Sequence, residues 1–313
     1  GRGGLRSALD ISPPVQHHRV MDHTAFLASL DSETRHRLTE RRRGQGLVHL
    51  SLHLGALGLT GAAIALGVPG WPLFLLPYGI LLVFLFTLQH ECTHRTPFAS
   101  DRLCDLVGHG IGALLLNPFV WFRYFHLAHH RFTNVAGDPE LDSPKPATRT
   151  ALVWHLTGLP LWWGSLSLIL RLALDRERPA YLPERARPRA VREARVLIFL
   201  YALVATSLIW TPIALWLWVL PVLLGQPFLR LYLLAEHGDC PQVADMFANT
   251  RTTLTIVPVR FLAWNMPYHV EHHVYPSVPF DRLPDLHARI RNHLQVTAQG
   301  YGAFAREFLA RRR

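Results

Sequence analysis

The chain has 313 residues, of which 50% are hydrophobic and 17% are charged, and its mean hydropathy is +0.15. A soluble domain carries about 25% charged residues, and a disordered chain is poor in apolar ones, so this composition argues against both classes. The formal net charge of +10 fits an anionic membrane surface better than a nucleic acid, because no nucleic-acid-binding motif accompanies it. We therefore expect a membrane protein without a nucleic-acid partner.

Asp31 and Ser32 are expected to cap the start of a helix that contains the Arg-rich stretch after them. Beyond it lie four apolar runs, at 47–67, 73–88, 196–209 and 213–234. The short turns at 68–72 and 210–212 pair these runs into two predicted hairpins, and a run of about 20 residues spans a bilayer core. The apolar stretch 151–174 would either span the membrane or lie in its interface, and the interface is the preferred interpretation.

Basic segments flank the ends of the runs that lie opposite the two turns. These segments are 35–43, 171–195 and 311–313, whereas the turns carry no charge. Because positively charged loops stay on the cytoplasmic side, both termini and the middle region are expected there. The predicted organisation is a basic N-terminal segment at 1–45, a membrane domain at 46–290 and a basic C-terminal tail at 291–313.

Nineteen histidines are an unusual number for this length, and many of them fall into three clusters. The first, HxxxH, consists of His90 and His94; the two HxxHH clusters consist of His126, His129 and His130, and of His269, His272 and His273. Positions i, i+3 and i+4 share one face of a helix, so each cluster is expected to point its imidazoles at one place. Such preorganised imidazoles predict a transition-metal site.

His237 lies at the end of the last apolar run and joins the eight as a ninth candidate ligand. Nine ligands are too many for one ion and suit two. Imidazole coordination fits Zn, Cu, Fe or Ni, so the ligands alone leave the metal open. The acidic stretch that begins at Asp138 would either orient these imidazoles or simply close a loop. His109 is expected to support the ligands from outside or to serve packing, and not to bind the metal itself.

The boxes, their order and the two apolar hairpins resemble the integral-membrane fatty acid desaturase and hydroxylase family over residues 45–290. The stretches 90–95, 121–132 and 265–276 look very like those of bacterial members. The resemblance implies an all-α fold with about four transmembrane helices in two hairpins and a cytoplasmic helical cap. It also implies two non-haem irons bound by the nine histidines, dioxygen as co-substrate, and a bacterial inner membrane as the location.

Two further expectations come with the resemblance. Asn265, one helical turn before His269, would touch a metal-bound water. The third box begins with His instead of the Gln of many front-end desaturases, and no fused cytochrome b5 signature accompanies it. Electrons are therefore expected from a separate protein: a ferredoxin, a rubredoxin or a cytochrome b5-like donor.

The predicted activity is desaturation of a long-chain acyl group in a membrane lipid. Desaturation and hydroxylation share the removal of the first hydrogen, so a hydroxylase or ketolase of an alkane, a carotenoid or another terpenoid is the alternative. A histidine-rich metal transporter is a distant alternative, because a transporter would place its ligands near the bilayer midplane. Here the histidines fall at the ends of the apolar runs and outside them.

Overall fold

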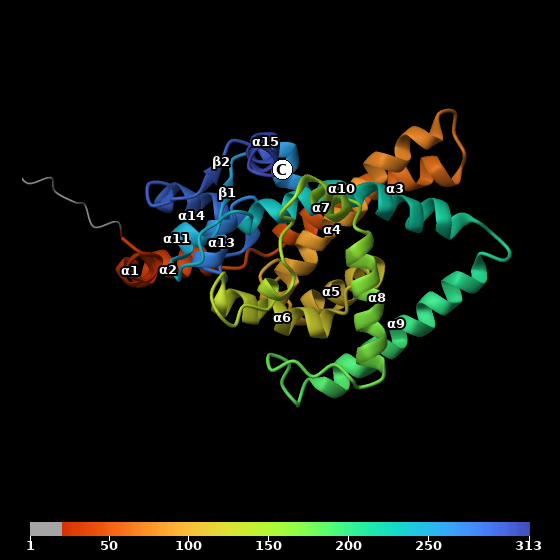
Figure 1. Ribbon diagram of the computed structural model, residues 1–313, viewed down its shortest axis with the longest axis horizontal. Coiled ribbons are helices and arrows are strands. Elements are labelled where there is room, and N and C mark those ends of the chain that lie inside the picture. Colours follow the sequence, from red (N-terminus) through yellow and green to blue (C-terminus); the bar gives the residue numbers. More distant parts are fainter. Residues whose placement is uncertain (1–20) are drawn as a thin grey trace, which may run out of the picture.

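The structure is a computed structural model that describes residues 21–313, and its regular secondary structure is almost entirely helical (Figure 1). The all-α prediction is confirmed, while the first twenty residues of the predicted segment 1–45 lie outside the described residues. The α-helices are α1 (His23–Ser29), α2 (Ser32–Thr39), α3 (Gln45–Ala65), α4 (Leu75–His94), α5 (Asp101–Leu115), α6 (Phe119–Phe132), α7 (Arg149–Leu156), α8 (Leu159–Ala173), α9 (Arg187–Ser207), α10 (Leu220–His237), α11 (Met246–Asn249), α12 (Val257–Leu262), α13 (His269–Val274), α14 (Leu283–Ile290) and α15 (Tyr301–Ala310).

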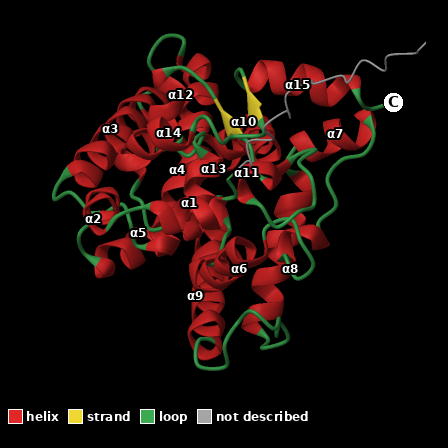
Figure 2. Ribbon diagram, turned by 90° about the vertical axis from the view of Figure 1, so that its left-hand side faces the viewer, coloured by secondary structure: helices red, strands yellow, loops and turns green. Residues whose placement is uncertain are grey.

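Shorter elements complete the chain. They are the 3₁₀ turns η1 (Trp71–Phe74), η2 (Pro139–Asp142) and η4 (Phe280–Arg282), the π-helical turn η3 (Leu215–Val219), and the strands β1 (Thr252–Thr253) and β2 (Thr297–Ala298). The two strands pair in parallel, with Thr252 opposite Thr297. Figure 2 shows this pair between α12 and α15, above α11 and α13.

Three helical stretches are long and apolar enough to cross a membrane: Gln45–Ala65, Trp71–His94 and Leu215–His237. Two bent pairs would raise the number to five, namely α5 with α6 at 101° and α7 with α8 at 57°. The expectation of about four spans lies inside this range. Of these three stretches Gln45–Ala65 is the least covered by the protein, since only 11% of its most apolar window is buried.

The second predicted hairpin differs in detail from the structure. Its first run was expected at 196–209, but α9 begins at Arg187 and so includes part of the Arg-rich segment. These charges keep α9 out of the three apolar stretches. The predicted interfacial stretch 151–174 is divided between α7 and α8, and its position in or across the membrane stays a prediction.

Helices α4 and α10 approach each other closely at the centre of the molecule. A Cβ atom on Gly79 would lie 2.1 Å from the carbonyl oxygen of Pro221, and one on Gly225 would lie 2.4 Å from the carbonyl oxygen of Gly79. Small residues at such crossings allow helix backbones to come into contact. This packing fixes the ends of the two helices that carry His90, His94 and His237.

Short helices of the C-terminal part of the chain lie around those ends. Figure 1 shows α11, α13 and α14 at one end of the molecule and the α3–α4 and α9–α10 connections at the other. The predicted cap of α2 is confirmed, because the Asp31 carboxylate accepts a hydrogen bond from the Thr34 backbone N–H. The segment 291–313 contains β2 and α15, and Phe304 and Phe308 of α15 pack against Leu234 and Ala235 of α10.

Candidate metal centre

The nine candidate histidines converge from four helices, α4, α6, α10 and α13 (Figure 1). His90 and His94 lie in the last turns of α4, and His237 ends α10. The box at 126–130 lies in α6, and the box at 269–273 forms most of the short helix α13. Eight of the nine side chains are buried, and His94 is half-buried.

Five histidines form a first cluster. They are His90, His94, His126, His130 and His272, and one ring nitrogen from each lies within 4.8 Å of all the others. The Nε2 atom of His126 lies 2.8 Å from that of His94 and 2.9 Å from that of His130. The Nε2 atoms of His130 and His272 are 3.0 Å apart. The first cluster therefore draws on α4, α6 and α13.

The other four histidines form a second cluster beside the first. The Nε2 atom of His237 lies 3.2 Å from the Nε2 atoms of both His129 and His269. The Nε2 atoms of His269 and His273 are 3.1 Å apart. Ring nitrogens of His129, His237 and His273 lie within 4.8 Å of one another.

This division corrects the expectation that each box points its imidazoles at one place. In α6, His126 and His130 face the first cluster while His129 faces the second. Helical positions i and i+4 differ by about 40° in direction, whereas adjacent positions differ by about 100°. An HxxHH box therefore supplies its i, i+4 pair to one cluster and its middle histidine to the other, and α13 does so in the reverse sense, with His272 in the first cluster.

Oxygen atoms contact the histidines of the second cluster at Nδ1, the ring nitrogen on the side away from the cluster. The Nδ1 atom of His129 lies 2.9 Å from Asp138 Oδ1, and that of His273 lies 3.1 Å from Thr133 Oγ1. The His237 Nδ1 atom lies 3.3 Å from the carbonyl oxygen of Asn249. Glu236 Oε1 is also 3.3 Å from His269 Nδ1, but no hydrogen bond joins these two atoms. An Nδ1 atom engaged in a hydrogen bond leaves Nε2 to face the cluster.

Asp138 is the acidic residue that the sequence singled out, and its position favours the orienting role. Burial opposes its ionisation, but hydrogen bonds from the His129 side chain and from the backbone N–H groups of Asn134 and Glu140 lower the pKa of Asp138. The carboxylate is therefore charged beside His129. Sequence reasoning missed Glu236, Thr133 and Asn249, although Glu236 directly precedes His237 and could have been noticed for that reason.

The first cluster has fewer such partners. His272 Nδ1 lies 3.7 Å from Glu91 Oε1, which is longer than a hydrogen bond. Among the described residues, both ring nitrogens of His90 lack a hydrogen-bond partner, and so does the Nδ1 atom of His130. These rings are held by the packing of the helices that carry them.

The donor set fits a pair of metal ions. Burial lowers the pKa of His269, His272 and His273, so these rings are neutral and present lone pairs. Two nitrogens that bind one ion at about 2.1 Å and at right angles lie about 3 Å apart. The Nε2 separations of 2.8–3.2 Å match that value, and lone pairs so close repel one another unless a cation lies between them.

Two buried glutamates inside the boxes form hydrogen bonds with neighbouring segments. Glu91 accepts hydrogen bonds from Thr96 Oγ1 at 2.8 Å and from the Phe280 backbone N–H at 3.2 Å. Glu271 accepts from Thr252 Oγ1 at 2.6 Å and lies 2.5 Å from His287 Nδ1. Each glutamate thus ties its helix to a neighbouring segment.

Asn265 does not precede His269 on one continuous helix. Trp264 and Asn265 have positive φ angles of 50° and 56°, and α13 begins only at His269. The Asn265 side-chain amide donates to the Phe280 carbonyl oxygen, and no hydrogen bond joins it to a histidine among the described residues. His109 lies apart from both clusters, 2.5 Å from Glu193.

Known proteins share this arrangement of sequence features. The profile of the family described as fatty acid desaturase matches residues 66–304. The chain belongs to the fatty acid desaturase family. This desaturase is accordingly an integral-membrane oxidoreductase that acts on lipids.

Relatives in cyanobacteria and in an insect extend over most of the chain. An sn-1 oleoyl-lipid 12-desaturase of Picosynechococcus sp. is 25% identical over 77% of this chain and 75% of its own length. The sn-1 oleoyl-lipid 12-desaturase of Synechocystis sp. is 27% identical over 75% of this chain and 74% of its own. A sphingolipid delta(4)-desaturase of Drosophila melanogaster is 27% identical over 66% of this chain and 62% of its own length.

Proposed function

We propose that this desaturase binds two iron ions and uses dioxygen to introduce a double bond into an acyl chain of a membrane lipid. The division of nine histidines into clusters of five and four carries the proposal. Each cluster offers enough nitrogens for one ion, and together they account for every candidate ligand. The family matched by residues 66–304 implies iron at such a site.

The nine Nε2-directed histidines would hold the metals: His90, His94, His126, His130 and His272 the first, and His129, His237, His269 and His273 the second. When bound, the iron pair supplies the dioxygen chemistry that removes hydrogen from two adjacent carbons. The carboxylate of Asp138 and the Thr133 hydroxyl keep His129 and His273 oriented with Nδ1 outward. Burial of the cluster excludes bulk water, which protects the reaction from side products.

The substrate we assign is a long acyl chain attached to a lipid, because two relatives act on oleoyl lipids according to their names. A chain of this kind can reach the centre without leaving the bilayer, since α4 and α10 carry His90, His94 and His237 at their ends. The relatives' names also suggest the twelfth position as the first one to test.

We place the histidine clusters and both termini on the cytoplasmic side of a bacterial inner membrane. The α3–α4 and α9–α10 connections carry no charge, whereas the Arg-rich segments lie at the other ends of these helices. A separate ferredoxin, rubredoxin or cytochrome b5-like protein would deliver electrons there. Asn265 would contact a metal-bound water only after its amide leaves the Phe280 carbonyl oxygen.

Lipid profiling tests this proposal directly. A bacterial host that lacks polyunsaturated lipids would express either the wild-type chain or the His130→Ala variant, and the acyl chains would be analysed by mass spectrometry. We expect a product that has lost two hydrogens, with the double bond located by chemical derivatisation. A product that has gained one oxygen atom would instead identify a hydroxylase.

A further inference from the structure

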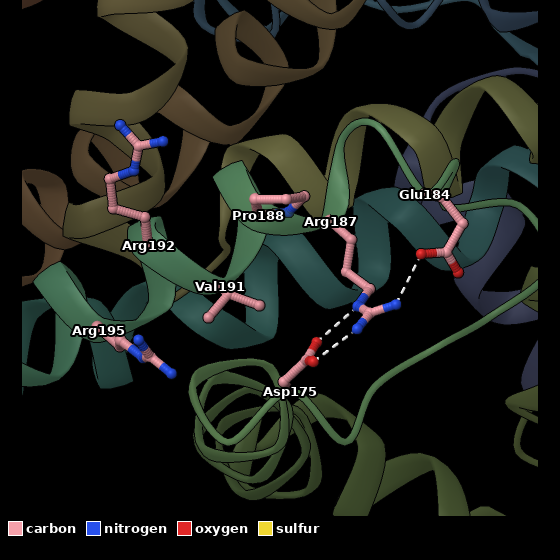
Figure 3. A pocket seen from close by; sticks show the side chains of 7 residues that line it. All are labelled: Asp175, Glu184, Arg187, Pro188, Val191, Arg192 and Arg195. Carbon is pink, nitrogen blue, oxygen red and sulfur yellow. Dashed lines mark hydrogen bonds and ion pairs between the residues drawn. The ribbon is translucent and has the colours of Figure 1, made fainter.

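A surface hollow lies far from any histidine box, where α8 ends and α9 begins (Figure 3). Its volume is about 500 Å³. Figure 3 shows Arg187, Val191 and Arg195 along one side of α9, with Asp175 opposite them. Arg192 and Glu184 complete the charged lining. The first turns of α9 thus form one wall, and the connection from α8 forms the other.

Packing and ion pairs hold these walls in place. Ala186, Ala190 and Ala194 form a buried row on α9 that packs in one cluster with Ile169 and Leu172 of α8. The Arg187 guanidinium holds the segment between α8 and α9 against this contact. It donates to both carboxylate oxygens of Asp175 at 2.6 and 2.7 Å and to Glu184 at 2.6 Å. The hollow therefore has a fixed shape and a charged edge.

The segment 171–195 carries an excess of positive charge, with eight arginines against four carboxylates. Every one of these carboxylates is already engaged. Asp175 and Glu184 bind Arg187, Glu177 binds Arg171 at 2.7 Å, and Glu193 accepts from the backbone N–H groups of Phe119 and Val120.

Two arginines of the lining are left with unused donors. Arg192 has no carboxylate within ion-pair distance among the described residues, and neither has Arg195. Arg195 donates only from Nε, to the carbonyl oxygen of Ala173 at 3.0 Å, so both of its terminal nitrogens are available. Guanidinium groups of this kind match the geometry of phosphate oxygens.

The surroundings of the hollow change from charged to apolar within one helical turn. On α9, Val196 and Phe199 are 51% and 63% exposed, directly after Arg195. At the end of α8, Leu170 and Leu174 are 54% and 52% exposed, and Leu174 directly precedes Asp175 of the lining. Such a boundary is typical of the depth at which lipid headgroups meet acyl chains. A ligand of the hollow must therefore combine an anionic head with apolar tails.

We propose that this hollow binds the headgroup of an acidic phospholipid that carries hydroxyl groups, such as a phosphoglycerol headgroup. Arg192 and Arg195 donate hydrogen bonds to the phosphate oxygens. The carboxylates of Asp175 and Glu184, neutralised by Arg187, accept hydrogen bonds from the headgroup hydroxyls. The acyl tails lie along the exposed apolar faces of α8 and α9. This site is independent of the histidine clusters and of the proposed reaction.

The test measures which lipids the full-length protein retains. The protein is reconstituted in nanodiscs that contain equal amounts of phosphatidylglycerol and phosphatidylcholine, extracted in mild detergent, and its bound lipids are counted by native mass spectrometry. We expect about tenfold enrichment of phosphatidylglycerol, the value of one charge-assisted contact. The double variant Arg192→Gln/Arg195→Gln should reduce this enrichment to parity.

Three comparisons make the test decisive. Arg189→Gln is the matched control, because Arg189 is exposed on the same helix and does not line the hollow. The single variant Arg192→Gln should give an intermediate enrichment, and it removes no contact that stabilises the fold. Phosphatidic acid, which lacks headgroup hydroxyls, should be retained less than phosphatidylglycerol. Full enrichment in the double variant, or equal binding of free inorganic phosphate and lipid, would overturn the proposal.

Discussion

The two histidine clusters are adjacent but are held in different ways. In the second cluster three of the four histidines have an oxygen acceptor at Nδ1: Asp138 for His129, Thr133 for His273 and the carbonyl oxygen of Asn249 for His237. The Nδ1 atom of the fourth, His269, lies 3.3 Å from Glu236 without a hydrogen bond. In the first cluster both nitrogens of His90 and the Nδ1 atom of His130 lack a partner among the described residues. The first cluster instead takes its rigidity from α4 and α6, each of which supplies an i, i+4 pair.

This difference teaches that two routes lead to a preorganised set of imidazoles. A long helix fixes two rings by its own geometry, and hydrogen bonds add little further order. The short helix α13 and the end of α10 cannot do this alone, so their rings are fixed by acceptors from neighbouring segments. The two clusters should therefore respond differently to the loss of a supporting residue and similarly to the loss of a ligand.

The largest effect is expected from the ligands themselves. His130→Ala in the first cluster and His273→Ala in the second should each lower turnover by more than about 100-fold and lower the metal content from two ions per chain to one. Elemental analysis and lipid profiling measure both quantities. His36→Ala, on exposed α2, should leave both unchanged. Full metal content and activity in either ligand variant would contradict the assignment of two ions.

The next effect should separate the clusters. Asp138→Asn removes the charge behind His129, so the affinity of the second cluster for metal should fall by about 10–100-fold while that of the first stays unchanged. Titration with a chelator, followed by elemental analysis, would show one ion lost before the other. Asp142→Asn is the control, because Asp142 is exposed in the same loop. Equal loss of both ions would remove the distinction between the clusters.

A smaller effect is expected at Glu91. Its carboxylate lies 3.7 Å from His272 Nδ1, so Glu91→Gln should weaken metal binding at the first cluster by less than about tenfold. The same chelator titration measures it. A loss as large as that of Asp138→Asn would show that the first cluster depends on acceptors after all.

The smallest effect should come from the far side of the second cluster. Arg312 donates to the Pro146 carbonyl oxygen at 2.7 Å and to Asp239 at 2.7 Å. Pro146 follows Lys145, whose Nζ donates to the carbonyl oxygen of His237, and Asp239 lies two residues after His237. Arg312→Ala should lower the free energy of unfolding by about 1–3 kcal/mol and release the second ion slightly sooner.

Thermal unfolding in detergent checks the stability of the Arg312 variant. Arg313→Ala is its control, because Arg313 contributes its backbone carbonyl oxygen to Arg149 and no side-chain hydrogen bond among those of residues 21–313. A larger loss from Arg313→Ala than from Arg312→Ala would show that this contact does not support the cluster.

The sequence by itself determined the features that depend on local order. The apolar runs at 47–67, 73–88 and 213–234 fall within the three helical stretches apolar enough to span, apart from residues at their ends. The cap at Asp31 and the nine histidines that converge were also readable, because caps and helical faces depend on residues a few positions apart.

Only the tertiary structure decided how those histidines are shared. The spacing HxxHH permits one target or two, and the choice depends on where α6 and α13 lie relative to each other. The acceptors Thr133 and Asn249 reach His273 and His237 through contacts between different segments, and Glu236 lies beside His269 in the same way. The bends of 101° and 57° and the early start of α9 likewise follow from packing. Long-range contacts of this kind leave no periodic trace in the sequence, since each joins residues whose separation the fold alone sets.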